Sequence, residues 1–277
     1  MRKTKLPSGE EMPVLGQGTW GMGEHPENRQ NEIDALRFGL DLEMTVIDTA
    51  EMYGDGAAEE LVGKAILGRR NDAILVTKVL PQNATRRGTV EACERSLRRL
   101  AVNHIDLYLL HWRGQVPLAE TLEAFDELVR AGKIRYWGVS NFDVADMEEL
   151  VGLSGGSAVA TDQVLYNLMR RGIEYDLLPW CEQRNIPIMA YSPLEQSRLL
   201  GTPELRRIAA EYSATPAQIA LAWVLRKDSI IAVPKASSPG HVKQNRVALD
   251  IPLSSDDFAA LDRAFPPPTE KRPLEVI

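Results

Sequence analysis

The stretch "TVIDTAEMYG" (residues 45–54) begins as a buried strand and then delivers polar side chains. Val46 and Ile47 are β-branched and apolar, which suits the interior of a sheet. Asp48 follows them directly, and Tyr53 comes five residues later. Where parallel strands end together, such side chains can form a site. The stretch therefore predicts a buried strand that carries a carboxylate, and then a phenol, to one edge of a sheet.

Seven other short, apolar, β-branched segments also predict strands, over residues 13–20, 73–78, 105–111, 134–140, 159–164, 187–193 and 230–235. Most of them lack alternation between apolar and polar residues, as expected when both faces of a parallel sheet are buried. From residue 45 onward their starts lie 25 to 43 residues apart. This period fits one strand and one helix per unit. The longest gap leaves room for an added helix over 202–212.

Segments with helical spacing separate the strands. Their apolar stripes are Ile33, Leu36 and Leu40; Val90, Cys93, Leu97 and Leu100; and Leu118, Leu122, Phe125 and Leu128. A further helix is predicted to start with Thr215 as N-cap, Pro216 in the first turn and Gln218 completing a capping box. Eight such units predict a closed (β/α)8 TIM barrel with a short N-terminal β-hairpin and one or two extra helices. An open, doubly wound sheet is the alternative.

Composition narrows the class of protein. The 277 residues carry a net charge of -7, and no run of Lys or Arg exceeds a pair, which argues against nucleic-acid binding. Cys93 and Cys181 form no disulfide framework, the first 14 residues lack a signal sequence, and no apolar run could cross a bilayer. We expect a single domain over 1–277 with a short tail over 266–277, acting as a cytoplasmic monomer on a small molecule.

Polar or aromatic side chains close nearly every predicted strand. They are Trp20, Asp48, Lys78, His111, Ser140, Asn141, Gln163, Tyr191, Ser192 and Lys235. Any one of them alone would be an ordinary strand terminus. Because barrel enzymes place their chemistry at this end, the whole set indicates a site.

Four of these side chains suit proton donation. A phenol has a pKa of about 10, and a nearby ammonium lowers it. Lys78 can supply that charge to Tyr53, while Asp48 keeps the buried lysine protonated and His111 orients a substrate oxygen. The alternative for Asp48 and Lys78 is a structural ion pair between adjacent strands.

Long motifs resemble the aldo-keto reductase family. They are "GTWGMG" (18–23), "IDTAEMYGDG" (47–56), "LVTKV" (75–79), "DLYLLHW" (106–112), "GKIRYWGVSNF" (132–142), "DQVLYN" (162–167), "YSPL" (191–194) and "VPKASSPGHVKQN" (233–245). The match looks closest to short bacterial members that reduce methylglyoxal and other small α-dicarbonyls. It implies an NADPH-dependent carbonyl reductase, with NADH as a possible substitute and without a metal. The resemblance implies Asp48, Tyr53, Lys78 and His111 as the catalytic residues.

The resemblance also implies how the cofactor binds. Tyr191 would stack on the nicotinamide, Ser140, Asn141 and Gln163 would hydrogen-bond its carboxamide, and the segment after Tyr191 would line the pyrophosphate path. The implied set is Thr19, Trp20, Asp48, Ser140, Asn141, Gln163, Tyr191, Ser192, Pro193, Leu194, Gln196, Lys235, Ser237, Ser238, His241, Gln244 and Asn245.

The segment after residue 233 is expected to hold the adenosine 2'-phosphate. A helix N-terminus has free amides that favour phosphate, and Lys235, Ser237, Ser238 and His241 lie there. Family members that prefer NADPH usually have arginine where His241 stands. Histidine lacks a planar fork and is often neutral near pH 7, so the selectivity for NADPH over NADH should be weaker unless Lys243 compensates.

The substrate is expected to contact Trp20, Met52, Tyr53, His111 and Trp112 in a largely apolar site. Members of the family with deep pockets often have a longer C-terminal loop. The short tail after "SSDDFAALDRAF" (254–265) therefore predicts an open mouth and tolerance for small aldehydes.

Other functions remain to be weighed. Lys78 could form a Schiff base in a barrel aldolase, or the barrel could be a non-catalytic subunit that binds the cofactor. "GQGTWG" (16–21) matches a Rossmann pattern, but Gly23 and Pro26 stand where its helix should begin. The four histidines show no metal-binding spacing.

Overall fold

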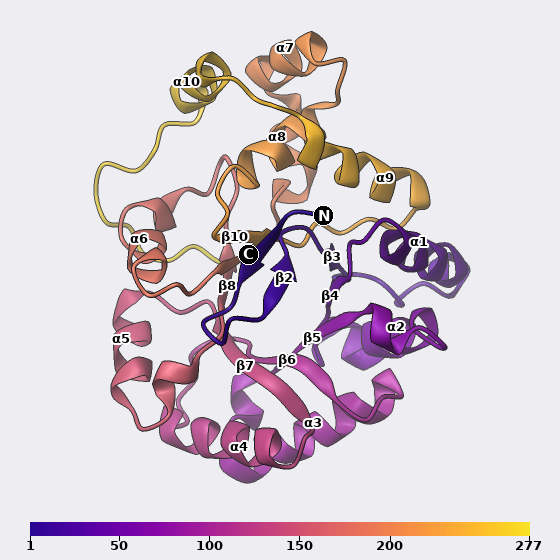
Figure 1. Ribbon diagram of the computed structural model, residues 1–277, viewed down its shortest axis with the longest axis vertical. Coiled ribbons are helices and arrows are strands. Elements are labelled where there is room, and N and C mark those ends of the chain that lie inside the picture. Colours follow the sequence, from indigo (N-terminus) through magenta and orange to yellow (C-terminus); the bar gives the residue numbers. More distant parts are fainter.

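Eight parallel strands form the centre of the computed structural model, which describes residues 1–277 (Figure 1). They hydrogen-bond in the order β10-β9-β8-β7-β6-β5-β4-β3. Parallel bridges between Leu15 and Ala232 and between Gly18 and Lys235 join the two outer strands, so the sheet closes into a barrel. The strands are β3 (Gln17–Gly18), β4 (Val46–Asp48), β5 (Ile74–Val79), β6 (Ile105–Leu110), β7 (Ile134–Ser140), β8 (Asp162–Leu165), β9 (Ile188–Tyr191) and β10 (Ile230–Ala232).

All eight predicted strands are therefore confirmed, although most are shorter than expected. The largest difference lies in residues 13–20, where only Gln17–Gly18 belongs to the barrel. Pro13 instead ends β2 (Glu11–Pro13), which pairs antiparallel with β1 (Lys3–Lys5). This pair is the expected N-terminal hairpin.

Helices surround the barrel, as Figure 1 shows. They are α1 (Arg29–Asp41), α2 (Ala57–Ala65), α3 (Arg86–Leu100), α4 (Leu118–Arg130), α5 (Val144–Gly152), α6 (Leu177–Glu182), α7 (Pro203–Glu211), α8 (Pro216–Val224), α9 (Pro239–Val247) and α10 (Ser255–Ala264). The predicted extra helix is α7, and α10 follows the barrel units. The start of α8 is as predicted, because Thr215 and Gln218 form a reciprocal capping box. No helix in the chain is long and apolar enough to cross a membrane.

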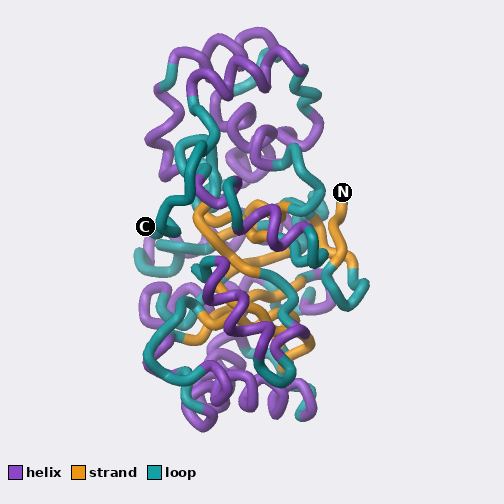
Figure 2. Tube along the Cα trace, turned by 90° about the vertical axis from the view of Figure 1, so that its left-hand side faces the viewer, coloured by secondary structure: helices purple, strands orange, loops and turns teal.

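The hairpin closes one end of the barrel. Leu6 and Met12 pack against interior side chains that include Val46, Val76 and Leu107. Figure 2 shows the N-terminus on one side of the strands and the C-terminus on the other. The strands finish at the opposite end of the barrel, which the hairpin does not cover.

The alternation of side chains along the strands determines which residues point into the barrel interior. Side chains two residues apart in a strand point the same way. Val46 and Val76 lie in the barrel interior, so Asp48 and Lys78 point into its upper layer. Apolar side chains thus fill the end of the barrel near the hairpin, while the charged side chains of Asp48 and Lys78 lie at the other end of the same rows.

Candidate functional site

Lys78 lies at the centre of a buried polar cluster. Its ammonium donates hydrogen bonds to Oδ1 of Asp48 at 2.8 Å, to the carbonyl oxygen of Thr49 at 2.7 Å and to the hydroxyl of Tyr53 at 3.2 Å. The side chain of Lys78 is fully buried. The structure therefore brings together three of the predicted catalytic residues, and Thr49 supplies a backbone acceptor that sequence reasoning missed.

Asp48 has a second partner. Nε2 of Gln163 donates to the same Oδ1 atom at 2.8 Å. The sequence pointed to Gln163 only as a partner for a carboxamide. Its Nε2 is instead committed to Asp48 here, which leaves its amide oxygen as the group that can accept a hydrogen bond from a ligand.

Burial and neighbouring charges have opposite effects on the pKa values of Lys78 and Tyr53. Burial lowers the pKa of Lys78, but the charges and hydrogen bonds of Asp48 and Tyr53 outweigh it and hold that pKa above its usual value. Burial raises the pKa of Tyr53, and Lys78 opposes this only in part. Lys78 thus acts on Tyr53 in the predicted direction, but the expected net lowering of the phenol pKa is wrong because desolvation is larger.

His111 lies beside this cluster and is neutral near pH 7. Burial, and secondarily the charge of Lys78, lower the pKa of His111 to about 3. The imidazole and the ring of Tyr53 have centroids 5.9 Å apart, and the ring of Trp112 is 4.8 Å from His111. Nδ1 of His111 is buried without a protein partner.

A tightly held turn places Tyr53. Gly54, Asp55 and Gly56 all have positive φ, which folds the chain back sharply after the phenol. Glu51 anchors this turn to the next one, because its carboxylate accepts hydrogen bonds from the amide of Leu80 at 2.8 Å and from Asn83 at 2.9 Å. Glu51 was not singled out from the sequence, since a carboxylate in a loop is usually a surface charge.

A cavity of about 1060 Å³ opens above the cluster. Predicted residues that line it are Thr19, Trp20, Asp48, Met52, Tyr53, His111, Trp112, Ser140, Asn141, Gln163, Tyr191, Ser192, Pro193, Leu194, Gln196 and Lys235. The lining also includes Gly18, Gly21, Arg113, Ser197, Val233 and Pro234, which were not predicted. The strand-end rule therefore locates the cavity well and misses mainly the loop residues around it.

Five of the predicted cofactor residues do not line this cavity. Ser237 and Ser238 lie just before α9, His241 lies in its first turn, and Gln244 and Asn245 lie in its second half. Ser238 caps the helix by accepting a hydrogen bond from the amide of His241 at 3.4 Å. Asn245 is buried, whereas His241 and Gln244 are exposed. Lys235, which does line the cavity, precedes Ser237 by two residues in the chain.

Asn141 and Tyr191 already contact each other across the cavity wall. The hydroxyl of Tyr191 donates to Oδ1 of Asn141 at 3.0 Å, and Asn141 donates to the carbonyl oxygen of His111 at 3.1 Å. Asn141 has a φ of 58°, the left-handed conformation that asparagine tolerates better than most residues. The wall thus presents one flat ring beside fixed amide groups.

The C-terminal tail reaches the cavity. Its last two residues, Val276 and Ile277, contribute to the lining. The sequence did not predict that the short tail would contribute to the lining; whether the mouth is open to small aldehydes stays a prediction. Thirteen residues follow α10, and the last two of them reach the cavity.

Comparison with known proteins identifies the family of this chain. A model of the "Aldo/keto reductase family" matches residues 14–265. The chain belongs to this family. It is thus an oxidoreductase, and the resemblance drawn from the motifs is confirmed.

Individual relatives cover nearly the whole chain. The methylglyoxal reductase YeaE of Escherichia coli is 50% identical over 96% of this chain and 95% of its own. An aldo/keto reductase from Klebsiella pneumoniae, solved in complex with NADP and acetate, is 51% identical with a TM-score of 0.97 over the full length of both chains. Another from the same organism, in complex with NADPH, is 50% identical with a TM-score of 0.98 over 100% of this chain and 99% of that one.

Proposed function

We propose that this protein reduces aldehydes and small α-dicarbonyls such as methylglyoxal to alcohols, using NADPH, with Tyr53 as the proton donor. The observation that carries the proposal is the buried contact of 3.2 Å between the ammonium of Lys78 and the hydroxyl of Tyr53. This contact lies under a cavity in which His111 is the neighbouring hydrogen-bonding group. The relatives bound to NADP and NADPH support the choice of cofactor.

The residues present fit a nicotinamide dinucleotide. The cavity wall offers the ring of Tyr191 as a flat surface, and the side chains of Ser140, Asn141 and Gln163 as partners for a carboxamide. Gly18, which lines the cavity, lets the chain pack closely against the backbone of Val233, since a Cβ there would lie 2.6 Å from the carbonyl oxygen of Val233. When bound, the reduced cofactor supplies a hydride to the carbonyl carbon. His241 and its neighbours at the start of α9 would meet a 2'-phosphate outside the cavity, and NADH remains a possible substitute.

Proton delivery follows from the buried cluster. A raised pKa keeps Tyr53 protonated across the physiological range. As negative charge develops on the substrate oxygen, Tyr53 gives up its proton, and Lys78 stabilises the phenolate that is left. Asp48 holds Lys78 in its charged form. His111 is neutral, so it can donate one hydrogen bond to the same oxygen without competing as an acid.

Several large apolar and aromatic side chains form the walls of the cavity around the proposed proton donor. Trp20 stands edge-on to Tyr53 with ring centroids 5.0 Å apart, and Trp112 and Met52 complete the rim. Ile277 adds an apolar side chain from the tail. Such walls leave orientation to Tyr53 and His111, which suits short aldehydes and dicarbonyls that differ mainly in size.

The Schiff-base alternative is less well supported. An attacking lysine must lose its proton, and low-pKa lysines serve this role. The pKa of Lys78 is raised, and its ammonium has three acceptors. Borohydride treatment with a carbonyl substrate should leave Lys78 unmodified. A covalent adduct there would favour the aldolase.

The test is oxidation of NADPH, followed at the absorbance band of the reduced nicotinamide, with methylglyoxal and a panel of short aldehydes. We expect turnover with NADPH and slower turnover with NADH. Binding of NADPH without turnover of any carbonyl would favour the non-catalytic subunit instead. We further propose that residues 1–277 act as one domain and one monomer, which sedimentation of the intact chain would test.

A further inference from the structure

The loop that follows β9 has a strained backbone, and side chains from other segments hold it in place. Glu195, Gln196 and Ser197 are consecutive non-glycine residues with φ of 48°, 50° and 69°. Such conformations are costly and persist only where the surroundings impose them. Gln196 and Ser197 line the cavity, so the strain lies in a segment of the proposed cofactor path.

Glu195 is the point at which this loop is held. Its side chain is only 1% exposed. One carboxylate oxygen accepts a hydrogen bond from Asn167 at 2.8 Å, and the other accepts two from Arg170 at 3.0 and 3.1 Å. Asn167 also donates to the carbonyl oxygen of Ser192 at 2.9 Å, at the start of the loop. The turn after β8 therefore holds the loop after β9 in place through the hydrogen bonds of Asn167 and Arg170.

Arg170 also holds the C-terminal tail. Its Nη1 atom donates to Oε1 of Glu275 at 2.5 Å, while Nε and Nη2 remain on Glu195. A guanidinium can serve two carboxylates at once because its donors form a rigid planar fork. One side chain thus joins the loop and the tail, which are far apart in the sequence.

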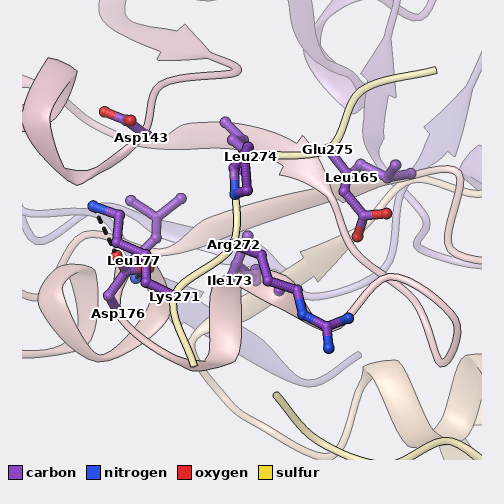
Figure 3. A pocket seen from close by; sticks show the side chains of 11 residues that line it. Asp143, Leu165, Ile173, Asp176, Leu177, Lys271, Arg272, Leu274 and Glu275 are labelled. Atoms are coloured by element: carbon purple, nitrogen blue, oxygen red, sulfur yellow. Dashed lines mark hydrogen bonds and ion pairs between the residues drawn. The ribbon is translucent and has the colours of Figure 1, made fainter. Parts of the chain in front are cut away.

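The C-terminal tail packs against the barrel through both an ion pair and an apolar contact. Figure 3 shows it running past Leu165 and Ile173, with Lys271 paired to Asp176. The Lys271–Asp176 distance is 3.3 Å, and Leu274 packs against the main core. The pocket between this part of the tail and the barrel has a volume of only about 20 Å³, room for roughly one water. A second pocket, of about 260 Å³, lies between Arg272 of the tail and Leu168. Beyond Glu275, the chain continues into the cavity lining.

We propose that Arg170 is a positioning residue that couples dinucleotide binding by the loop after β9 to closure of the tail over the substrate cavity. Gln196 and Ser197 line the cavity from the loop and Ile277 from the tail, and the same guanidinium holds both segments. A ligand that orders the loop therefore lowers the cost of ordering the tail, and the linkage is reciprocal. This inference rests on the proposed function, since it takes the loop as part of the dinucleotide site.

The test compares Glu275→Gln with Lys271→Gln. Both changes remove one ion pair of the tail, but only the first acts on Arg170. Hydrogen exchange of peptides covering 193–200 and 271–277 is measured with and without NADP+, together with the Kd for NADPH and the kcat and KM for methylglyoxal. In the wild-type chain and in Lys271→Gln, NADP+ should slow exchange in both peptides.

In Glu275→Gln we expect NADP+ to protect only the 193–200 peptide, and the Kd for NADPH to rise roughly fivefold or more. KM for methylglyoxal should rise more than kcat falls. Equal protection and equal Kd in the two variants would overturn the coupling while leaving the reductase intact. A wild-type chain that neither binds NADPH nor turns over would overturn both proposals, and this failure appears before any variant is compared.

Discussion

Lys78 and Asp48 form a fully desolvated ion pair, with Nζ 2.8 Å from Oδ1 and both side chains at most 4% exposed. They stand at the ends of neighbouring strands, and strand alternation points both into the barrel. Burying two charges is costly, and their attraction offsets that cost only when both partners are present. The pair therefore makes the site sensitive to the loss of either member.

Removal of the carboxylate alone should destabilise the fold. In Asp48→Asn, Lys78 would keep a buried charge without its main partner, so the free energy of unfolding should fall by about 3–5 kcal/mol. Urea unfolding measures this change. The double variant Asp48→Asn/Lys78→Met should recover much of the loss because no buried charge remains. A single variant as stable as the wild type would contradict the arrangement.

His111 should make stability depend on pH. Its pKa is about 3 in the folded chain and about 6.5 when unfolded. Below about pH 6.5 the unfolded chain binds a proton that the folded chain refuses, so stability present above that pH is lost as pH falls toward 3. His111→Gln should flatten this slope in urea unfolding, whereas His25→Gln, at an exposed histidine, should not. Equal slopes in both variants would show that His111 is not held neutral.

Asp162 should make stability depend on pH with the opposite sign, so that stability falls as pH rises. Burial raises the pKa of Asp162 well above its ordinary value, and Oδ2 has no partner. Its contribution to stability is present below the ordinary pKa of 3.8 and is lost as pH rises. The stability of Asp162→Asn relative to the wild type should therefore increase from pH 4 to pH 8. Asp228→Asn, at an exposed carboxylate, should show no such trend, and a flat difference for Asp162→Asn would count against a buried neutral acid.

Arginine at position 241 should sharpen the choice of cofactor. A guanidinium at the exposed start of α9 can bind a 2'-phosphate with two hydrogen bonds. His241→Arg should raise the ratio of kcat/KM for NADPH to that for NADH by about tenfold, equivalent to about 1.4 kcal/mol. His25→Arg adds the same charge elsewhere and should leave the ratio unchanged. If both variants behave alike, the phosphate does not bind at α9.

The sequence predicted the barrel well because its strands are short apolar runs at a steady period. The clearest example is residues 134–140, where the observed strand has both of the predicted bounds. Residues 13–20 were less predictable, since Pro13 suits a hairpin edge and only Gln17 and Gly18 enter the barrel. Sequence pattern shows that a run is buried, but not which neighbour it pairs with.

Site residues at the ends of strands could be predicted from the sequence, whereas contacts between loops could not. Asp48, Lys78 and His111 follow from strand periodicity, so their convergence could be predicted. The contacts of Arg170 with Glu195 and Glu275 join three separate segments, and no local pattern reports them. The sequence also does not show how deeply the loop residue Tyr53 is buried, and this burial raises the pKa of Tyr53 despite Lys78.

The most direct test of the central claim is turnover of methylglyoxal with NADPH by Tyr53→Phe. Phenylalanine keeps the ring that packs against Trp20 and His111 but removes the proton, so kcat should fall by about 10²–10⁴, with the Kd for NADPH nearly unchanged. Tyr175→Phe, at an exposed tyrosine, should retain full activity. A Tyr53→Phe variant with wild-type kcat would show that the proton comes from another group.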